Sequence, residues 1–235
     1  MARKASNSMS SRLTRFETIA GWLYLPFYLI ILNLLLQLAN EKLSLGMSAL
    51  TINIAYFAIN LAATLLIFHG FLRQSYFGGS FWNFVQALIL GFALYYAGTW
   101  VLQFALTKLA PGFTIYNNET VGSLISDNEY IMMAVTIILA PVIEETLVRG
   151  LVFGSIRPTS RVMAYIVSVV LFTLMHNWQY FLLYPAGKVL LSCIPYLPAS
   201  VALAWTYEKA GTIWAPITLH ALINALSFGL LQLNF

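Results

Sequence analysis

Long runs of apolar residues dominate the chain. Seven such segments can be marked, at residues 18–39, 49–72, 81–106, 130–153, 162–180, 189–207 and 212–231. A helix needs about 20 apolar residues to cross a bilayer, and the segments lack the alternation of apolar and polar positions that is typical of strands. The pattern therefore predicts an all-α, polytopic membrane helix bundle of about seven transmembrane helices.

The composition of the 235-residue chain also indicates folding in lipid. Hydrophobic residues make up 60% of it and charged residues only 9%, whereas a water-soluble domain has roughly half and a quarter. An aromatic content of 15% excludes a disordered chain. Cys193 is the single cysteine, so an intramolecular disulfide and a multi-cysteine metal site are excluded, and we expect a packing residue.

The basic residues indicate how the chain is oriented in the membrane. Placing the N-terminus in the cytoplasm puts most of them on the inner side, namely Arg3, Lys4, Arg12, Arg15, Arg73, Arg157, Arg161 and Lys209. The positive-inside rule therefore predicts an integral membrane protein with an N-in, C-out topology. The net charge of +4 is spread between apolar runs, so we expect the lipid bilayer as a partner and no nucleic acid.

Three regions can be distinguished along the chain. Residues 1–17 form a basic cytoplasmic N-terminal arm, residues 18–127 three transmembrane spans with an outer loop, and residues 128–235 a core of four spans. The stretch 108–129 is the one long polar connection, and no internal repeat relates the two halves. A transporter built from repeats is therefore disfavoured.

Three ionisable residues lie deep inside the fourth apolar segment. Glu144, Glu145 and Arg149 need partners or a function there, because a charged side chain at such a depth costs at least about 2.5 kcal/mol. The i, i+4 spacing places Glu145 and Arg149 on one helix face and predicts a structural ion pair. Glu144 is rotated from this pair by about 100° and is the carboxylate left for chemistry.

Two histidines lie inside later apolar segments. His176 ends the sequence that starts at Phe172, and His220 lies four residues before Asn224, on the same helix face. With a helical rise of about 1.5 Å per residue, Glu144, His176 and His220 all fall within the hydrocarbon core, so we expect that they can meet.

Two prolines precede these candidate residues. Pro141 lies three residues before Glu144, and Pro216 lies four residues before His220. Each proline leaves a backbone carbonyl without its helical donor, which is tolerated in lipid only where protein or water supplies another donor. A hydrated cavity and a plain packing kink are both consistent with this pattern.

Three motifs of this chain resemble those of a known family. In order and spacing, the EExxxR, FxxxH and HxxxN motifs of the CPBP family match Glu144–Arg149, Phe172–His176 and His220–Asn224. This family comprises membrane-embedded CAAX prenyl protease and bacteriocin-processing proteins, and is also called the Abi family. The resemblance implies that residues 128–235 are the catalytic core. It also implies that Glu144 and His176 activate water, while His220 and Asn224 stabilise the oxyanion or help to hold a metal ion.

The residue types leave two mechanisms open. Zinc binds histidine nitrogens and carboxylate or amide oxygens, so His176 and His220 are candidate metal ligands that an oxygen from another helix would complete. A metal-free mechanism instead needs only Glu144 as a general base beside water.

The resemblance implies an intramembrane endopeptidase that hydrolyses a peptide bond in a membrane-associated peptide or a lipid-anchored protein. It also implies a place in a bacterial cytoplasmic membrane. One alternative keeps the fold without the chemistry, as a bacteriocin-immunity or signalling scaffold that binds a membrane signalling protein. Another is a proton-coupled transporter in which Glu144, Glu145 and the histidines form a relay.

Overall fold

The computed structural model describes residues 13–110 and 112–232, in which every regular element is helical. The first elements are α1 (Arg15–Pro26), the π-helix η1 (Phe27–Ile31), α2 (Leu32–Lys42), α3 (Ala49–Phe77), α4 (Phe81–Leu109) and α5 (Tyr116–Asp127). One continuous helical stretch then comprises α6 (Glu129–Ala134), the π-helix η2 (Val135–Leu139), α7 (Ala140–Glu145), the π-helix η3 (Thr146–Phe153) and α8 (Gly154–Ile156). The last elements are α9 (Arg161–Met175), the 3₁₀-helix η4 (Trp178–Leu182), α10 (Ala186–Cys193), the 3₁₀-helix η5 (Ile194–Tyr196), α11 (Leu197–Ala210) and α12 (Trp214–Gln232).

Helices occupy all seven apolar segments, so the predicted all-α membrane helix bundle is confirmed and the protein is an integral membrane protein. Five stretches in the described part are long and apolar enough to cross a membrane: Arg15–Lys42, Ala49–Tyr76, Phe81–Leu109, Glu129–Ile156 and Ala186–Ala210. Helix α9 is apolar but shorter, and α12 has 19 residues. The count of seven spans and the N-in, C-out topology stay predictions.

Two regions between or before the spans are more helical than the sequence pattern suggests. Most of the predicted basic arm, residues 1–12, lies outside the described residues, and α1 already begins at Arg15 with Thr14 as its N-cap. The polar connection 108–129 contains the helix α5. The predicted outer loop therefore contains a helix of its own.

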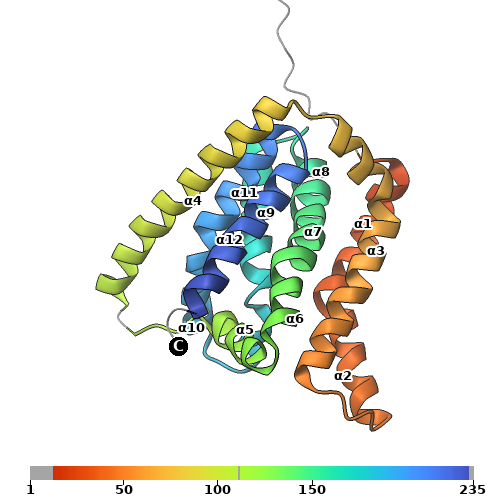
Figure 1. Cartoon of the computed structure of the whole chain (residues 1–235), viewed down its shortest axis with the longest axis vertical. Helices are drawn as coiled ribbons and strands as arrows, with labels where there is room; N and C mark the ends of the chain where they lie inside the picture. The colour runs from red at the N-terminus through yellow and green to blue at the C-terminus, as the bar shows by residue number, and fades with distance from the viewer. Residues whose placement is uncertain (1–12, 111, 233–235) are drawn as a thin grey trace, which may run out of the picture.

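Helices α7, α9, α11 and α12 form the centre of the bundle, with α1–α3 on one side and α4 slanting across the other (Figure 1). Helix α11 packs against α4, α9 and α12, while α3 packs against α1, α2 and α7. The largest apolar cluster includes the almost completely buried Phe68, Phe71, Leu147, Leu151 and Phe153. Among the five long stretches, the one that carries both glutamates is the most enclosed by protein.

Helix α3 changes direction at Phe68, whose backbone angles (φ −107°, ψ 15°) are not helical. Beyond this break, the Phe71 N–H donates to the buried carboxylate of Glu17 at 2.6 Å. The other oxygen of Glu17 accepts from the Thr14 N–H at 2.7 Å, which completes a capping box at the start of α1. Gly70 allows the approach, because a Cβ there would lie 3.0 Å from a Glu17 oxygen. One carboxylate therefore joins the start of α1 to the kink of α3.

Two of the basic residues used to predict the topology are ion-paired. Glu208, near the end of α11, accepts from Arg157 Nε at 2.5 Å and lies 2.8 Å from an Arg161 terminal nitrogen. The Tyr165 hydroxyl donates to the same carboxylate at 2.9 Å. Glu208 thereby fixes the start of α9 to the end of α11.

Candidate active site

The three motifs meet in the interior of the bundle. Helix α7 carries Glu144 and Glu145, η3 carries Arg149, the end of α9 carries His176, and α12 carries His220. The distance between His176 Nε2 and Glu144 Oε2 is 3.7 Å, and the distance between His220 Nδ1 and Glu145 Oε1 is 2.9 Å. The structure thus brings together the side chains that the sequence placed at a similar depth.

Glu145 and Arg149 form the predicted ion pair, at 3.0 Å and with both side chains completely buried. The Glu145 oxygen that accepts from Arg149 also accepts from His220 Nδ1. Arg149 further donates to the backbone and hydroxyl oxygens of Ser200 on α11, at 3.0 and 3.1 Å. Its guanidinium lies 4.3 Å from the centre of the Phe172 ring. Arg149 therefore ties three helices together, and sequence reasoning missed Ser200 because nothing distinguishes one serine in an apolar run.

Glu144 is the carboxylate that this network leaves out. Its side chain is 8% exposed and that of His176 is 15% exposed, whereas those of Glu145 and Arg149 are 0% exposed. Access to the site therefore leads to Glu144 and His176. Glu144 Oε2 has no hydrogen-bond partner among the described residues. Such a buried oxygen is costly. Glu145 Oε2 has no partner in the described part of the chain either, but Glu145 is paired with Arg149 and completely buried, so Glu144 is the carboxylate that remains available for chemistry.

His176 lies at the end of its helix and not inside it, because α9 ends at Met175, short of the expected residue 180. Its Nδ1–H donates to the Phe172 carbonyl at 2.8 Å, which leaves Nε2 facing the carboxylate. The rings of Phe172 and Tyr196 flank the imidazole, each with its centre 4.7 Å away, and Tyr196 is stacked on it at 29°. The predicted site residues did not include Tyr196, which fixes the orientation of this histidine.

Helix α5 contacts the segment that follows the candidate histidine. The Tyr116 N–H donates to the Ser192 hydroxyl at 3.2 Å, and this hydroxyl donates to Asn177 Oδ1 at 2.8 Å. The Tyr196 hydroxyl donates to Asn118 Oδ1 at 3.2 Å. The polar connection, expected to be a plain outer loop, thus holds both the residue after the histidine and the tyrosine stacked on it.

Asn224 supplies a hydrogen-bond donor that Pro141 lacks. Asn224 Nδ2 donates at 2.7 Å to the carbonyl of Thr136, five residues before this proline, where η2 has the wider π-helical spacing. Proline has no N–H for that carbonyl. Pro216 lies in the first turn of α12, where the leading N–H groups have no helical acceptor in any case. At both prolines the packing explanation is therefore favoured over a hydrated cavity.

The residues present do not fit a three-ligand zinc site. The described part of the chain contains no group of three His, Cys, Asp or Glu side chains placed to hold a metal ion. The bonds from Nδ1 of His176 and His220 to oxygens leave Nε2 of each ring available, as in histidines that bind a metal. The nearby Glu145 carboxylate, however, is paired with Arg149. Structural and catalytic zinc sites need at least three protein ligands, and the described residues do not bring three such side chains together. The metal-dependent and the metal-free mechanism both stay predictions.

Comparison with known proteins supports the family recognised from the motifs. The family model of type II CAAX prenyl endopeptidases, Rce1-like, matches residues 126–226, which contain all three motifs. The recognition of this family is therefore confirmed for the segment that carries the site. The UPF0177 protein YxdF of Lactococcus lactis subsp. lactis (strain IL1403) is 33% identical over 88 residues, which are 37% of this chain and 42% of that protein. The match thus spans less than half of this relative, and no solved structure gives a significant match.

Proposed function

We propose that the protein is an intramembrane endopeptidase in which Glu144 is the general base. One observation carries the proposal: the buried Glu144 carboxylate has an oxygen without a hydrogen-bond partner and faces His176 Nε2 across 3.7 Å. The family that matches this segment is described as an endopeptidase family. A general base must lie within reach of the water that it deprotonates, and hydrogen bonds at such sites tighten when substrate binds.

Hydrolysis needs one proton to move twice. A water molecule between Glu144 and His176 gives a proton to the carboxylate while its oxygen forms a bond to the carbonyl carbon of the substrate. The carbonyl becomes a tetrahedral oxyanion. The proton on Glu144 then passes to the amide nitrogen as the C–N bond breaks, which releases a carboxyl end and an amine and restores the carboxylate. His176, with its Nδ1–H already used, accepts a hydrogen bond from the water through Nε2 and orients it.

His220 and Asn224 are the proposed donors to the oxyanion. Since the Nδ1–H of His220 is bonded to Glu145, the imidazole donates through Nε2 only when it is protonated. In that state the charges of the two glutamates, Arg149 and His220 sum to zero, which is the least costly arrangement to bury. Asn224 uses one amide N–H for a backbone carbonyl and has a second one for the substrate.

We propose a membrane-associated peptide or a lipid-anchored protein as the substrate, because the site lies inside a helix bundle whose long helices cross the bilayer. The competing function is the non-proteolytic immunity or signalling scaffold. A scaffold needs the packing of the site but not the carboxylate of Glu144. The two functions therefore differ in their response to one substitution.

Glu144→Gln tests the proposal, since the amide keeps the shape of the side chain but cannot accept a proton from water. We expect the rate to fall by about 10² to 10⁴-fold, with unchanged yield and thermal stability in detergent. New peptide termini in membranes of expressing cells, compared between wild type and variant by mass spectrometry, measure turnover without a known substrate. Glu145→Gln is the matched control, and it should lower stability because it weakens a buried pair. Equal sets of termini from wild type and Glu144→Gln would exclude Glu144 as the base.

A further inference from the structure

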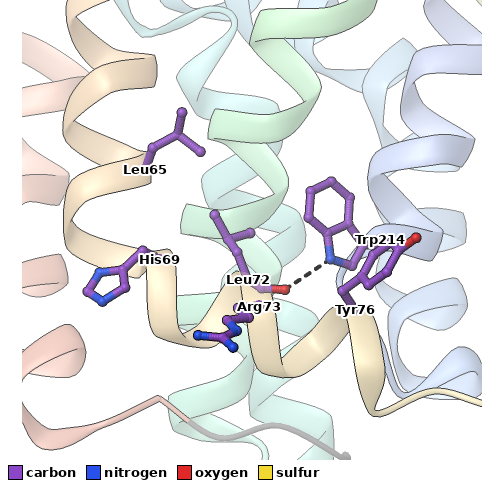
Figure 2. Close-up of a pocket in the computed structure, with 6 residues that line it drawn as sticks. All are labelled: Leu65, His69, Leu72, Arg73, Tyr76 and Trp214. Carbon is purple, nitrogen blue, oxygen red and sulfur yellow. Dashed lines mark hydrogen bonds between the residues drawn. The ribbon is translucent and has the colours of Figure 1, made fainter.

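A cavity of about 360 Å³ lies between the last turns of α3 and the start of α12, away from the candidate active site. It is lined by Leu65, His69, Leu72, Arg73, Tyr76 and Trp214. Figure 2 shows that the ribbon of α3 turns between Leu65 and Tyr76. Because of this turn, residues of α3 line most of the cavity, and Trp214 of α12 completes it. The turn follows from the kink at Phe68, which Glu17 holds from α1.

Two basic side chains lie at the edge of this mainly apolar cavity. His69 and Arg73 are one helical turn apart on α3, and both are exposed. Arg73 has no hydrogen-bond or ion-pair partner among the residues that the structure describes, unlike Arg157 and Arg161. His69 donates from Nδ1 to the Leu66 carbonyl at 3.1 Å, which turns Nε2 outward. The guanidinium of Arg73 can donate to an anion, and His69 can donate to the same anion through Nε2 when its ring is protonated.

The wall beside these side chains is apolar and fixed in shape. The indole N–H of Trp214 donates to the Leu72 carbonyl at 3.1 Å, as drawn in Figure 2. The ring of Tyr76 meets Trp214 edge-on, with the ring centres 6.1 Å apart. Leu65 is 45% exposed on the same helix. Arginine beside tryptophan and tyrosine is the combination of residues found where lipid headgroups meet acyl chains.

We propose that this cavity binds one anionic phospholipid, with its phosphate on Arg73 and His69 and the first part of an acyl chain along Leu65, Leu72 and Trp214. Arginine binds phosphate through paired N–H groups. A free phosphate would not contact the apolar wall. A phospholipid fits both parts of the site, because its phosphate can bind the basic side chains and its acyl chain can lie along the apolar wall. The site does not depend on the proposed proteolysis.

Native mass spectrometry of the full chain in detergent tests this inference with phosphatidylglycerol, phosphatidylcholine and inorganic phosphate as probes. We expect one phosphatidylglycerol to be retained in preference to phosphatidylcholine. Arg73→Gln should weaken this binding about tenfold, as the loss of a hydrogen bond to a charged group does, and Arg73→Lys should weaken it less. Lys209→Gln is the matched control, because it removes one exposed positive charge from the neighbouring end of α11.

Two results would overturn the inference. Equal phosphatidylglycerol retention by wild type and Arg73→Gln would show that the lipid binds elsewhere. Displacement of the lipid by an equal concentration of inorganic phosphate would show a simple anion site with no role for the apolar wall. A normal thermal unfolding curve for Arg73→Gln verifies that the exposed substitution leaves the fold intact.

Discussion

The buried Glu145–Arg149 pair gives the sharpest prediction on stability. Arg149→Ala removes the 3.0 Å ion pair, two hydrogen bonds to Ser200 and the contact with the Phe172 ring. Breaking a buried pair by removing one partner costs about 3 to 5 kcal/mol. Glu145 keeps its 2.9 Å bond to His220, so we expect the lower end of this range. For a chain of this size that corresponds to a fall in Tm of about 6 to 12 °C.

The control is a second substitution that removes the stranded charge. In Glu145→Gln/Arg149→Met neither side chain is charged, so the double variant should recover part of the Tm lost by Arg149→Ala. Arg149→Lys should lie between wild type and Arg149→Ala, since an ammonium keeps the charge but not the fork that reaches Ser200. Fluorescence-monitored thermal unfolding in one detergent compares all four proteins. An Arg149→Ala protein with wild-type Tm and no activity would refute the structural assignment and place Arg149 in the chemistry.

The other predictions concern orientation, topology and metal. Tyr196→Leu should lower kcat about three- to tenfold, which corresponds to the loss of one ring contact, because the variant no longer holds the His176 ring in place; KM and Tm should stay nearly unchanged. Tyr196→Phe should retain most of the activity. Equal kcat for wild type and both variants would contradict this role of Tyr196. Reporter fusions should place the loop at 157–161 inside and the connection 108–129 outside, and the opposite result would invert the topology. Elemental analysis should find no stoichiometric zinc in active protein; one zinc per chain, lost in both His176→Ala and His220→Ala, would establish the metal site instead.

The sequence predicted what depends on composition and spacing. Apolar length located the helices, and the i, i+4 rule found the ion pair of Glu145 and Arg149, because both depend on one helix at a time. The end of α9 was missed because no Pro or Gly marks it. The helix ends where the His176 ring bonds back to its own last turn. Tyr196 was missed because its stacking depends on the packing of two helices.

A partial signal existed for Asn224. Pro141 indicates that one backbone carbonyl lacks a helical N–H donor, and a side-chain amide in another apolar helix can provide that donor. Only the three-dimensional structure pairs the two, because the register between α12 and η2 is set by packing. The kink of α3 could not be predicted for the same reason, since the Glu17 carboxylate that accepts from the Phe71 N–H comes from another helix, α1.

The position of α12 in the chain has a consequence for biosynthesis. Helices are made in order from the N-terminus, so the stretch that carries both glutamates enters the membrane well before His220 and Asn224 leave the ribosome. Until α12 arrives, Glu145 lacks one of its two bonds and the Thr136 carbonyl lacks its donor. The insertion of α12 thus supplies the partners of both groups, and a nascent chain stopped before residue 214 would expose these unpaired groups to the proteases that remove incomplete membrane proteins.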